Sequence, residues 1–331
     1  MNTTAFTTLH FTSTTASDRP RPDQKQPEGD AKTRARAAAD RALVLGGGGS
    51  AGNAWLIGVI AGLFDAGLDV TKADLIIGTS AGSTAAAQIT AASPTRLFGD
   101  TLVTAPRQGS APAGQRGGRA PVGPPTDHLR RTSEIIAAAE DPTDMRRRLG
   151  LSALELDAAS DGSGHARWRA TVAARLPSQH WPQQRILLTA VDAHTGDPVV
   201  FDRYSGVDLA DAIAASCSSG TPYEIGDHRF IDGGYRRSSE NADLAVGFGR
   251  VLVLSPLGGR TRAPLEWGMQ LATQVEELRA GGSRVETVLP DSDSLDAFGS
   301  NLMDLSRRPA AARAGYEQAI ALAEQLTEFW L

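Results

Sequence analysis

A serine between two glycines is the first residue in this sequence whose setting suggests chemistry. An apolar run leads into Gly-Thr-Ser-Ala-Gly at residues 78–82, and a stretch of small residues with helical character follows, 81–92. This is the G-x-S-x-G pattern of a strand-to-helix turn. The flanking Gly78 and Gly82 leave room for a strained backbone that lifts the serine hydroxyl above the sheet. We therefore predict that Ser80 is a nucleophile; an ordinary small-residue turn is the alternative.

A second glycine-rich turn comes earlier, at residues 46–52 with the sequence GGGGSAG. It stands between an expected strand, 42–46, and an expected helix, 52–66. Backbone N–H groups at such a turn, at the positive end of a helix dipole, form a site for an anion. The letters also satisfy G-x-G-x-x-G, and Asp69 follows at about the distance of the ribose contact in a dinucleotide fold. A dinucleotide-binding oxidoreductase therefore stays open as an alternative function.

Beside a nucleophilic serine, the same turn has a different use. The N–H groups of Gly47, Gly48 and Gly49 would then donate to the oxygen of a tetrahedral acyl intermediate, as an oxyanion hole. The sequence contains no G-x-x-x-x-G-K-[ST] motif, which excludes a P-loop.

The base that would activate Ser80 is not found among the histidines. An ordinary α/β-hydrolase orders its triad as serine, acid and histidine, but no histidine follows Asp232, the last acid in a suitable context. The histidines fall at positions 10, 128, 165, 180, 194 and 228, and we expect His10, in the tail, and His194 and His228, in turns, to be solvated or turn residues. Asp232 remains as the base. It ends an expected strand, and Gly233 and Gly234 let the backbone turn close to another segment.

These motifs, in this order, resemble the patatin-like phospholipase family over about residues 42 to 260. In that family a Ser-Asp dyad replaces the triad, the aspartate acts directly on the serine, and the glycine turn forms the oxyanion hole. By this resemblance the roles fall on Ser80, Asp232 and the glycines at 47–49. The resemblance implies a three-layer α/β/α fold, a lipid acyl ester as substrate, and neither a metal nor an organic cofactor.

One position departs from the family pattern. The family usually reads G-G-G-x-[RK]-G, and Ala51 stands here at the basic position. Loss of this cation would weaken the electrostatic stabilisation of an oxyanion, although backbone donors need no side chain. A weak or inactive family member that binds a lipid or a protein is therefore a second hypothesis beside the acyl hydrolase.

Short apolar runs that alternate with amphipathic stretches from Arg41 onward predict a mostly parallel sheet covered by helices. The expected strands are 42–46, 75–78, 185–191, 198–202, 229–232, 251–255 and 284–288. The expected helices are 52–66, 81–92, 127–140, 164–175, 208–215, 264–280 and 309–328. Helix 208–215 is expected to pack beside the active site, and Asn241 to brace the loop that carries Asp232.

The chain is expected to form one domain, 41–331, behind a disordered tail, 1–40. The tail is rich in Thr, Pro, Ala and charged residues, and it has too few large apolar groups to offset the entropy of ordering. Residues 104–126 are rich in Gly, Pro and Arg without any acid, which predicts a flexible surface loop. This loop is either a flap that engages anionic lipid or a passive insertion, and composition alone favours the insertion.

Charge and cysteine content exclude several function classes. The 33 Lys and Arg against 38 Asp and Glu give a formal net charge of −5, which provides no field for nucleic acid. The single cysteine, Cys217, rules out an intramolecular disulfide, and we expect a packed thiol. The uncharged stretches are too rich in Gly, Ala, Ser and Thr for membrane spans, and the start of the chain does not read as a signal peptide. We expect a cytoplasmic protein that contacts an anionic membrane surface transiently.

Overall fold

The computed structural model describes residues 40–103, 125–159 and 164–331. The expected tail and the loop at 104–126 fall almost wholly outside these ranges. Among the described residues, no helix has the length and apolar character that crossing a membrane requires.

The described chain is built on one mixed sheet with a parallel centre. Its order is β5-β6-β3-β2-β1-β7-β8, with β4 paired to β3. The pairs β3–β2, β2–β1, β1–β7 and β7–β8 are parallel. Strands β4 and β6 each pair antiparallel with β3, and β5 pairs antiparallel with β6. The strands are β1 (Arg41–Leu45), β2 (Leu75–Gly78), β3 (Ile186–Asp192), β4 (Pro198–Phe201), β5 (Tyr223–Ile225), β6 (His228–Asp232), β7 (Arg250–Leu254) and β8 (Arg284–Val288).

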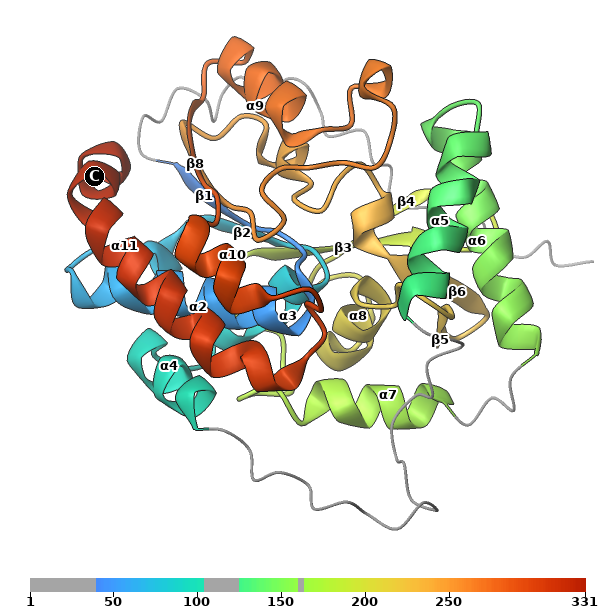
Figure 1. Cartoon of the computed structure of the whole chain (residues 1–331), viewed down its shortest axis with the longest axis horizontal. Coiled ribbons are helices and arrows are strands. Elements are labelled where there is room, and N and C mark those ends of the chain that lie inside the picture. The colour runs from blue at the N-terminus through green and yellow to red at the C-terminus, as the bar shows by residue number, and fades with distance from the viewer. Residues whose placement is uncertain (1–39, 104–124, 160–163) are drawn as a thin grey trace, which may run out of the picture.

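Helices cover both faces of this sheet, which gives the expected three-layer α/β/α architecture (Figure 1). The helices are α2 (Gly49–Asp65), α3 (Ala81–Ile89), α4 (Pro94–Leu102), α5 (Pro125–Ala138), α6 (Pro142–Ala158), α7 (Gly164–Ala173), α8 (Leu209–Ser216), α9 (Leu271–Ala280), α10 (Ser292–Phe298) and α11 (Arg308–Trp330). In Figure 1, α9 lies on the opposite side of the strands from α2, α10 and α11.

Alternation along β1 explains the two buried layers. Leu43 and Leu45 pack into the larger core with α2, α3, α8 and α11, whereas Ala42 and Val44 pack with α9 in a smaller one. Successive side chains of a strand point to opposite faces, so a strand covered on both sides reads as a continuous apolar run. The core therefore fixes the carboxyl ends of β1 and β2, from which the two glycine-rich turns emerge.

Sequence and structure differ at the expected helix 264–280. The structure has a short 3₁₀ turn, η4 (Leu265–Trp267), then a break, and α9 begins only at Leu271. Gly268 at the break has a φ of 62°, a left-handed conformation that ends a helix. Three helices, α4, α6 and α10, and the three-residue strand β5 were not expected from the sequence.

Candidate active site

Ser80 stands at the sharp turn between β2 and α3. Its φ of 52° and ψ of −113° are strained for a residue with a side chain. The Ser80 N–H donates to Ser216 Oγ at 2.9 Å, at the end of α8. A Cβ on Gly82 would collide with the carbonyl oxygen of Leu45, so only glycine allows α3 to pass this close to β1. This is the turn predicted from the sequence, with α8 beside it as expected.

Asp232 ends β6 and lies next to the same turn. Its N–H donates to the Ser218 carbonyl at 2.9 Å, and the Gly234 N–H donates to its Oδ1 at 2.8 Å. A Cβ on Gly233 would collide with Thr189 of β3, so this glycine lets the chain turn directly against the sheet. The Asp232 side chain is 7% exposed. The carboxylate is therefore fixed in a buried position.

The Ser80 side chain lies near enough to the Asp232 carboxylate to influence its pKa. Burial raises the pKa of Asp232 to about 6, and the hydrogen bond from the Gly234 N–H and the proximity of Ser80 oppose this rise only in part. A carboxylate with this pKa is ionised at neutral pH and is a stronger base than an ordinary aspartate. The arrangement can therefore take a proton from the serine hydroxyl without an intervening histidine.

The glycine turn after β1 lies against Ser80. A Cβ on Gly47 would lie 3.5 Å from Ser80 Cβ. The Gly47 N–H already donates to the Ser239 carbonyl at 2.8 Å. Among the described residues we find no acceptor for the N–H groups of Gly48 and Gly49, which begin α2. The N–H groups of Gly48 and Gly49 are thus without a partner in the described residues, whereas the donor of Gly47 is occupied.

A buried carboxylate, that of Glu240, supports the glycine turn after β1 through Ser239. Glu240 is fully buried and accepts hydrogen bonds from three serine hydroxyls at 2.6 to 2.8 Å; the donors are Ser238, Ser239 and Ser255. Ser239 in turn holds Gly47. The sequence analysis did not identify Glu240, because three serines that converge from two segments have no local signature.

Asn241 connects the nucleophile strand with the aspartate loop. Its Nδ2 donates to the Gly233 carbonyl at 2.9 Å, to Thr79 Oγ1 at 3.0 Å and to Thr189 Oγ1 at 3.3 Å. Its backbone is left-handed, with a φ of 53°, which asparagine tolerates better than most residues. The predicted bracing of the Asp232 loop is confirmed.

Ala51 is fully buried, and its N–H donates to the Leu302 carbonyl at 2.9 Å. A guanidinium nevertheless reaches this turn, from the start of α11. Arg308 Nη1 donates to the Ser50 carbonyl and to Asn53 Oδ1, each at 3.0 Å. Asn53 Nδ2 donates onward to the carbonyl of Ala81, the residue after the nucleophile, at 3.3 Å. The cation missing at position 51 has a counterpart from a distant part of the chain.

Arg308 remains charged at neutral pH. Burial, and secondly the nearby Arg175, lower its pKa to about 10. No sequence signal pointed to this residue, which precedes Pro309 far from the three motifs.

Two of the described histidines form side-chain hydrogen bonds with aspartates other than Asp232. His165 pairs with Asp157 and His228 with Asp192, both away from the Ser80 turn. Asp69, weighed from the sequence as a ribose ligand, uses its carboxylate to cap the turn η1 (Val70–Lys72). Within the ranges that the structure describes, no cluster of His, Cys, Asp and Glu could hold a metal ion.

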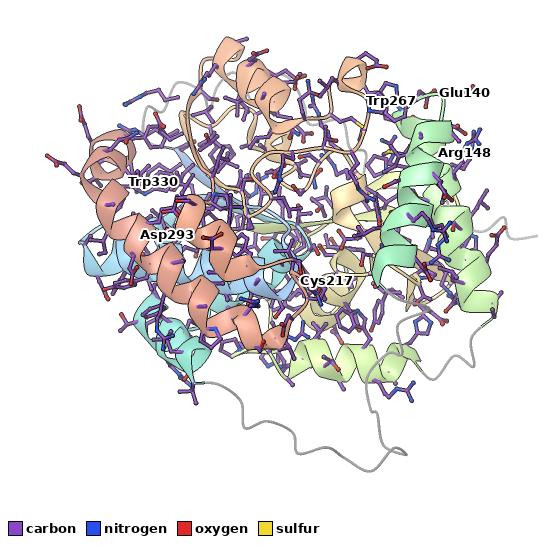
Figure 2. All side chains as sticks on the ribbon, in the orientation of Figure 1. Glu140, Arg148, Cys217, Trp267, Asp293 and Trp330 are labelled. Carbon is purple, nitrogen blue, oxygen red and sulfur yellow. The ribbon has the colours of Figure 1, made fainter. Side chains whose placement is uncertain are left out.

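Cys217, which is half-buried, is labelled in Figure 2 near the ribbons of α3 and α8. Its thiol donates to the Ser80 carbonyl at 3.1 Å. Burial raises the pKa of the thiol to about 11, and Asp232 adds to this rise. The thiol is therefore protonated at neutral pH, which agrees with the packed cysteine expected from the sequence.

Comparison with solved structures gives distant similarities. VipD from Legionella pneumophila has a TM-score of 0.39 and 11% identity over 87% of this chain and 67% of its own. ExoU, a type III effector protein, has a TM-score of 0.37 and 15% identity over 87% of this chain. ExoU of Pseudomonas aeruginosa in complex with SpcU has a TM-score of 0.31 and 16% identity over 86% of this chain. The chain spans 53% of ExoU in both structures.

No curated protein matches this chain. The sequence does match a protein family, the patatin-like phospholipases, over residues 43–246. This range contains both glycine-rich turns, Ser80, Asp232 and Asn241, and it is more than half of the chain. The chain therefore belongs to the patatin-like phospholipase family.

Proposed function

We propose that this protein is a serine hydrolase of lipid acyl esters that works through a Ser80–Asp232 dyad. One observation carries the proposal: Ser80, at the strained turn, lies beside a buried carboxylate whose pKa is raised to about 6. Membership of the family supports hydrolysis of lipid esters in general. The identity of the base and of the oxyanion donors is our inference.

In the proposed reaction, Asp232 takes the hydroxyl proton as Ser80 Oγ attacks the ester carbonyl carbon. The carbonyl π electrons move to the oxygen, which the N–H groups of Gly48 and Gly49 stabilise. The intermediate collapses with loss of the alcohol, which takes the proton from Asp232, and leaves an acyl-serine. Water then attacks the acyl carbon as Asp232 takes its proton, and the intermediate collapses with release of the fatty acid while Asp232 returns the proton to Ser80 Oγ. No step needs a metal or an organic cofactor.

Arg308 adds to this proposal a source of positive charge for the oxyanion. It contacts Ser50, the residue after Gly49, and it reaches the backbone of α3 through Asn53. Backbone N–H groups provide direct donors, and a partly buried guanidinium nearby strengthens the positive potential of the turn. The alanine at position 51 is then compatible with activity.

The surroundings of the glycine turn suit an apolar acyl chain. Leu302 lies against Gly49 and Ala51, and the exposed side chains of Met303 and Leu305 follow it. These residues place an apolar rim beside the proposed oxyanion site. The sequence expectation of a cytoplasmic protein with transient contact to anionic membranes belongs to the same proposal.

Hydrolysis of p-nitrophenyl butyrate tests the proposal. We expect turnover in the wild-type protein and in Ser205→Ala, an exposed serine of a surface turn, and no turnover in Ser80→Ala. Activity in Ser80→Ala would contradict the proposal. Absence of activity in the wild type on short-chain and phospholipid esters alike would favour the binding-module hypothesis. Retention of NAD by the purified protein would favour the dinucleotide alternative.

A further inference from the structure

A cleft is lined by residues of α5, α6 and the segment from β6 into η2 (Gly233–Tyr235); these elements lie near one another in Figure 1. The enclosed part of this cavity has a volume of about 10 Å³, room for one water molecule, and the rest is a mouth open to solvent. Ile231 lines this cavity, whereas the next residue, Asp232, contacts Ser80. Leu149 and Ala153 of α6 complete the apolar wall with Ile231. The mechanism proposed above makes no use of this space.

The polar wall of the cavity carries two arginines. Arg131 of α5 lines it directly. Arg262 Nη1 donates to Thr132 Oγ1 at 2.6 Å, and Arg262 lies near enough to Tyr235 to lower the pKa of its phenol. Both Thr132 and Tyr235 line the cavity. Neither arginine forms an ion pair with a carboxylate within the described part of the chain.

Arg130, the neighbour of Arg131 on α5, differs from the two arginines at the cavity because it has carboxylate partners. It faces outward and pairs with Asp127 at 3.9 Å and Glu134 at 3.2 Å. The arginines at the cavity instead act on a histidine: burial and then Arg131 and Arg262 lower the pKa of His128. The positive charge at the cavity is therefore not neutralised by the protein.

Neutral donors stand beside these charges. Burial, and secondly Asp232, raise the pKa of Tyr235 to about 12, so its phenol stays protonated at neutral pH. The phenol donates to the Ser219 carbonyl at 3.3 Å, a long contact that a better acceptor could replace. The hydroxyls of Thr132 and Ser152 also line the cavity.

We propose that this cavity is a phosphate-binding site formed by Arg131, Arg262 and Tyr235. Arg131 is half-buried and Arg262 is exposed, and neither has a carboxylate partner among the described residues, so a bound dianion or diester would neutralise positive charge that the chain leaves unpaired. The planar arginine fork matches the oxygens of a phosphate, and charge-assisted hydrogen bonds of this kind are the strong ones. The apolar wall opposite suits the glycerol or acyl carbons attached to such a phosphate.

The cavity and the dyad share neighbouring residues of two segments. The carbonyl of Ser218 holds the Asp232 N–H, and the next residues, Ser219 and Gly220, line the cavity. A phospholipid carries its phosphate on the same glycerol as its ester bonds. That the phosphate belongs to a substrate head group rests on the proposed function; phosphate binding itself does not.

The test uses full-length protein with the Ser80→Ala substitution, so that lipids stay intact, and glycerol 3-phosphate as the probe. Calorimetric titration is expected to give saturable binding. Arg131→Gln and Arg262→Gln should each weaken the probe at least about tenfold, the effect of one charge-assisted hydrogen bond. Arg130→Gln removes the same charge from the same helix and should change the affinity by less than about threefold.

Absence of saturable binding, or equal weakening by all three substitutions, would overturn the site. Near-ultraviolet circular dichroism checks the fold of each variant. If a glutamine variant does not fold, Arg131→Lys replaces it; this variant keeps the charge but loses the fork, and is expected to weaken binding by a smaller factor than loss of the charge. Unchanged affinity for glycerol 3-phosphate in both the folded Arg131→Lys variant and the folded Arg262→Gln variant would also overturn the site.

Competition identifies the source of the phosphate. Displacement of the probe by phosphatidylglycerol vesicles supports a lipid head group, whereas displacement by inorganic phosphate alone overturns the head-group assignment. The two proposals fail separately. A wild-type protein that hydrolyses esters but binds no glycerol 3-phosphate removes only the cavity proposal, and arginine-dependent binding without any hydrolysis removes only the proposed function.

Discussion

The two sides of the β6–η2 segment carry opposite electrostatic environments. On one side Asp232 is buried with two hydrogen bonds, and no arginine contributes to its pKa. On the other side Arg131 and Arg262 surround Tyr235 without a carboxylate partner. A guanidinium in contact with Asp232 would lower the pKa of the carboxyl and weaken it as a base. Separation of the charges keeps one side basic and leaves the other side free to bind an anion.

The largest expected effect concerns the basic side. Ser80→Ala and Asp232→Asn should each lower kcat by more than about 10³-fold, and the double variant should be no worse than either one, since residues that act as a unit are non-additive. Steady-state kinetics on a soluble ester measures this. Losses that multiply in the double variant would show that the two residues act independently.

A smaller effect concerns stability. The pKa of Asp232 is raised from 3.8 to about 6 in the folded protein, so ionisation destabilises the native state as the pH rises through this interval. Asp232→Asn removes this penalty. It should increase the free energy of unfolding by on the order of 2 kcal/mol at pH 8 and by much less at pH 4.

Urea denaturation at both pH values measures the change. Asp100→Asn, an exposed aspartate of α4, is the control and should stay within about 0.5 kcal/mol at either pH. A lower free energy of unfolding for Asp232→Asn than for the wild type at pH 8 would mean that the ionised carboxylate stabilises the native state instead of destabilising it.

Arg308→Gln separates the source of positive charge at the oxyanion from the arginines of the cavity. We expect kcat to fall about tenfold with little change in KM, because the charge acts on the transition state. Arg313→Gln, an exposed arginine on the same helix, should have no effect. A change in KM alone would place Arg308 in substrate binding.

The smallest expected effect is that of the histidines. His165→Ala and His228→Ala should each leave kcat within about tenfold of the wild type. A histidine that is not the general base contributes none of the usual 10²–10⁴-fold of general base catalysis. A single histidine variant as inactive as Ser80→Ala would restore a triad in an unusual order.

The parts of the site that the sequence predicts are those encoded locally. The turn at 78–82 carries its own glycines, and Asp232 is followed directly by Gly233 and Gly234, so both could be placed before the structure was known. The seven expected strands are all present, and β1, β2, β3 and β7, which pair in parallel, are buried strands that read as short apolar runs.

Long-range features could not be predicted in the same way. Arg308 meets Ser50 across the folded chain, and Arg262 meets Thr132 in the same manner. The occupied N–H of Gly47 depends on Ser239, which lies far away in sequence. Such contacts follow from packing, which no local motif records. The unexpected helix α6 is different, since Asp141 and Pro142 form an ordinary N-terminal signal that was overlooked.

The central claim is that Asp232 alone activates Ser80. The most direct test is the pH dependence of covalent labelling by a fluorophosphonate, followed by intact-mass and peptide mass spectrometry. The account predicts a single adduct on Ser80 and a labelling rate that rises with pH about a midpoint near 6 as Asp232 loses its proton. In Asp232→Asn this rise should disappear and labelling should be at least about 10³-fold slower. Labelling of Ser80 in Asp232→Asn at the wild-type rate, or with an unchanged midpoint, would contradict the account.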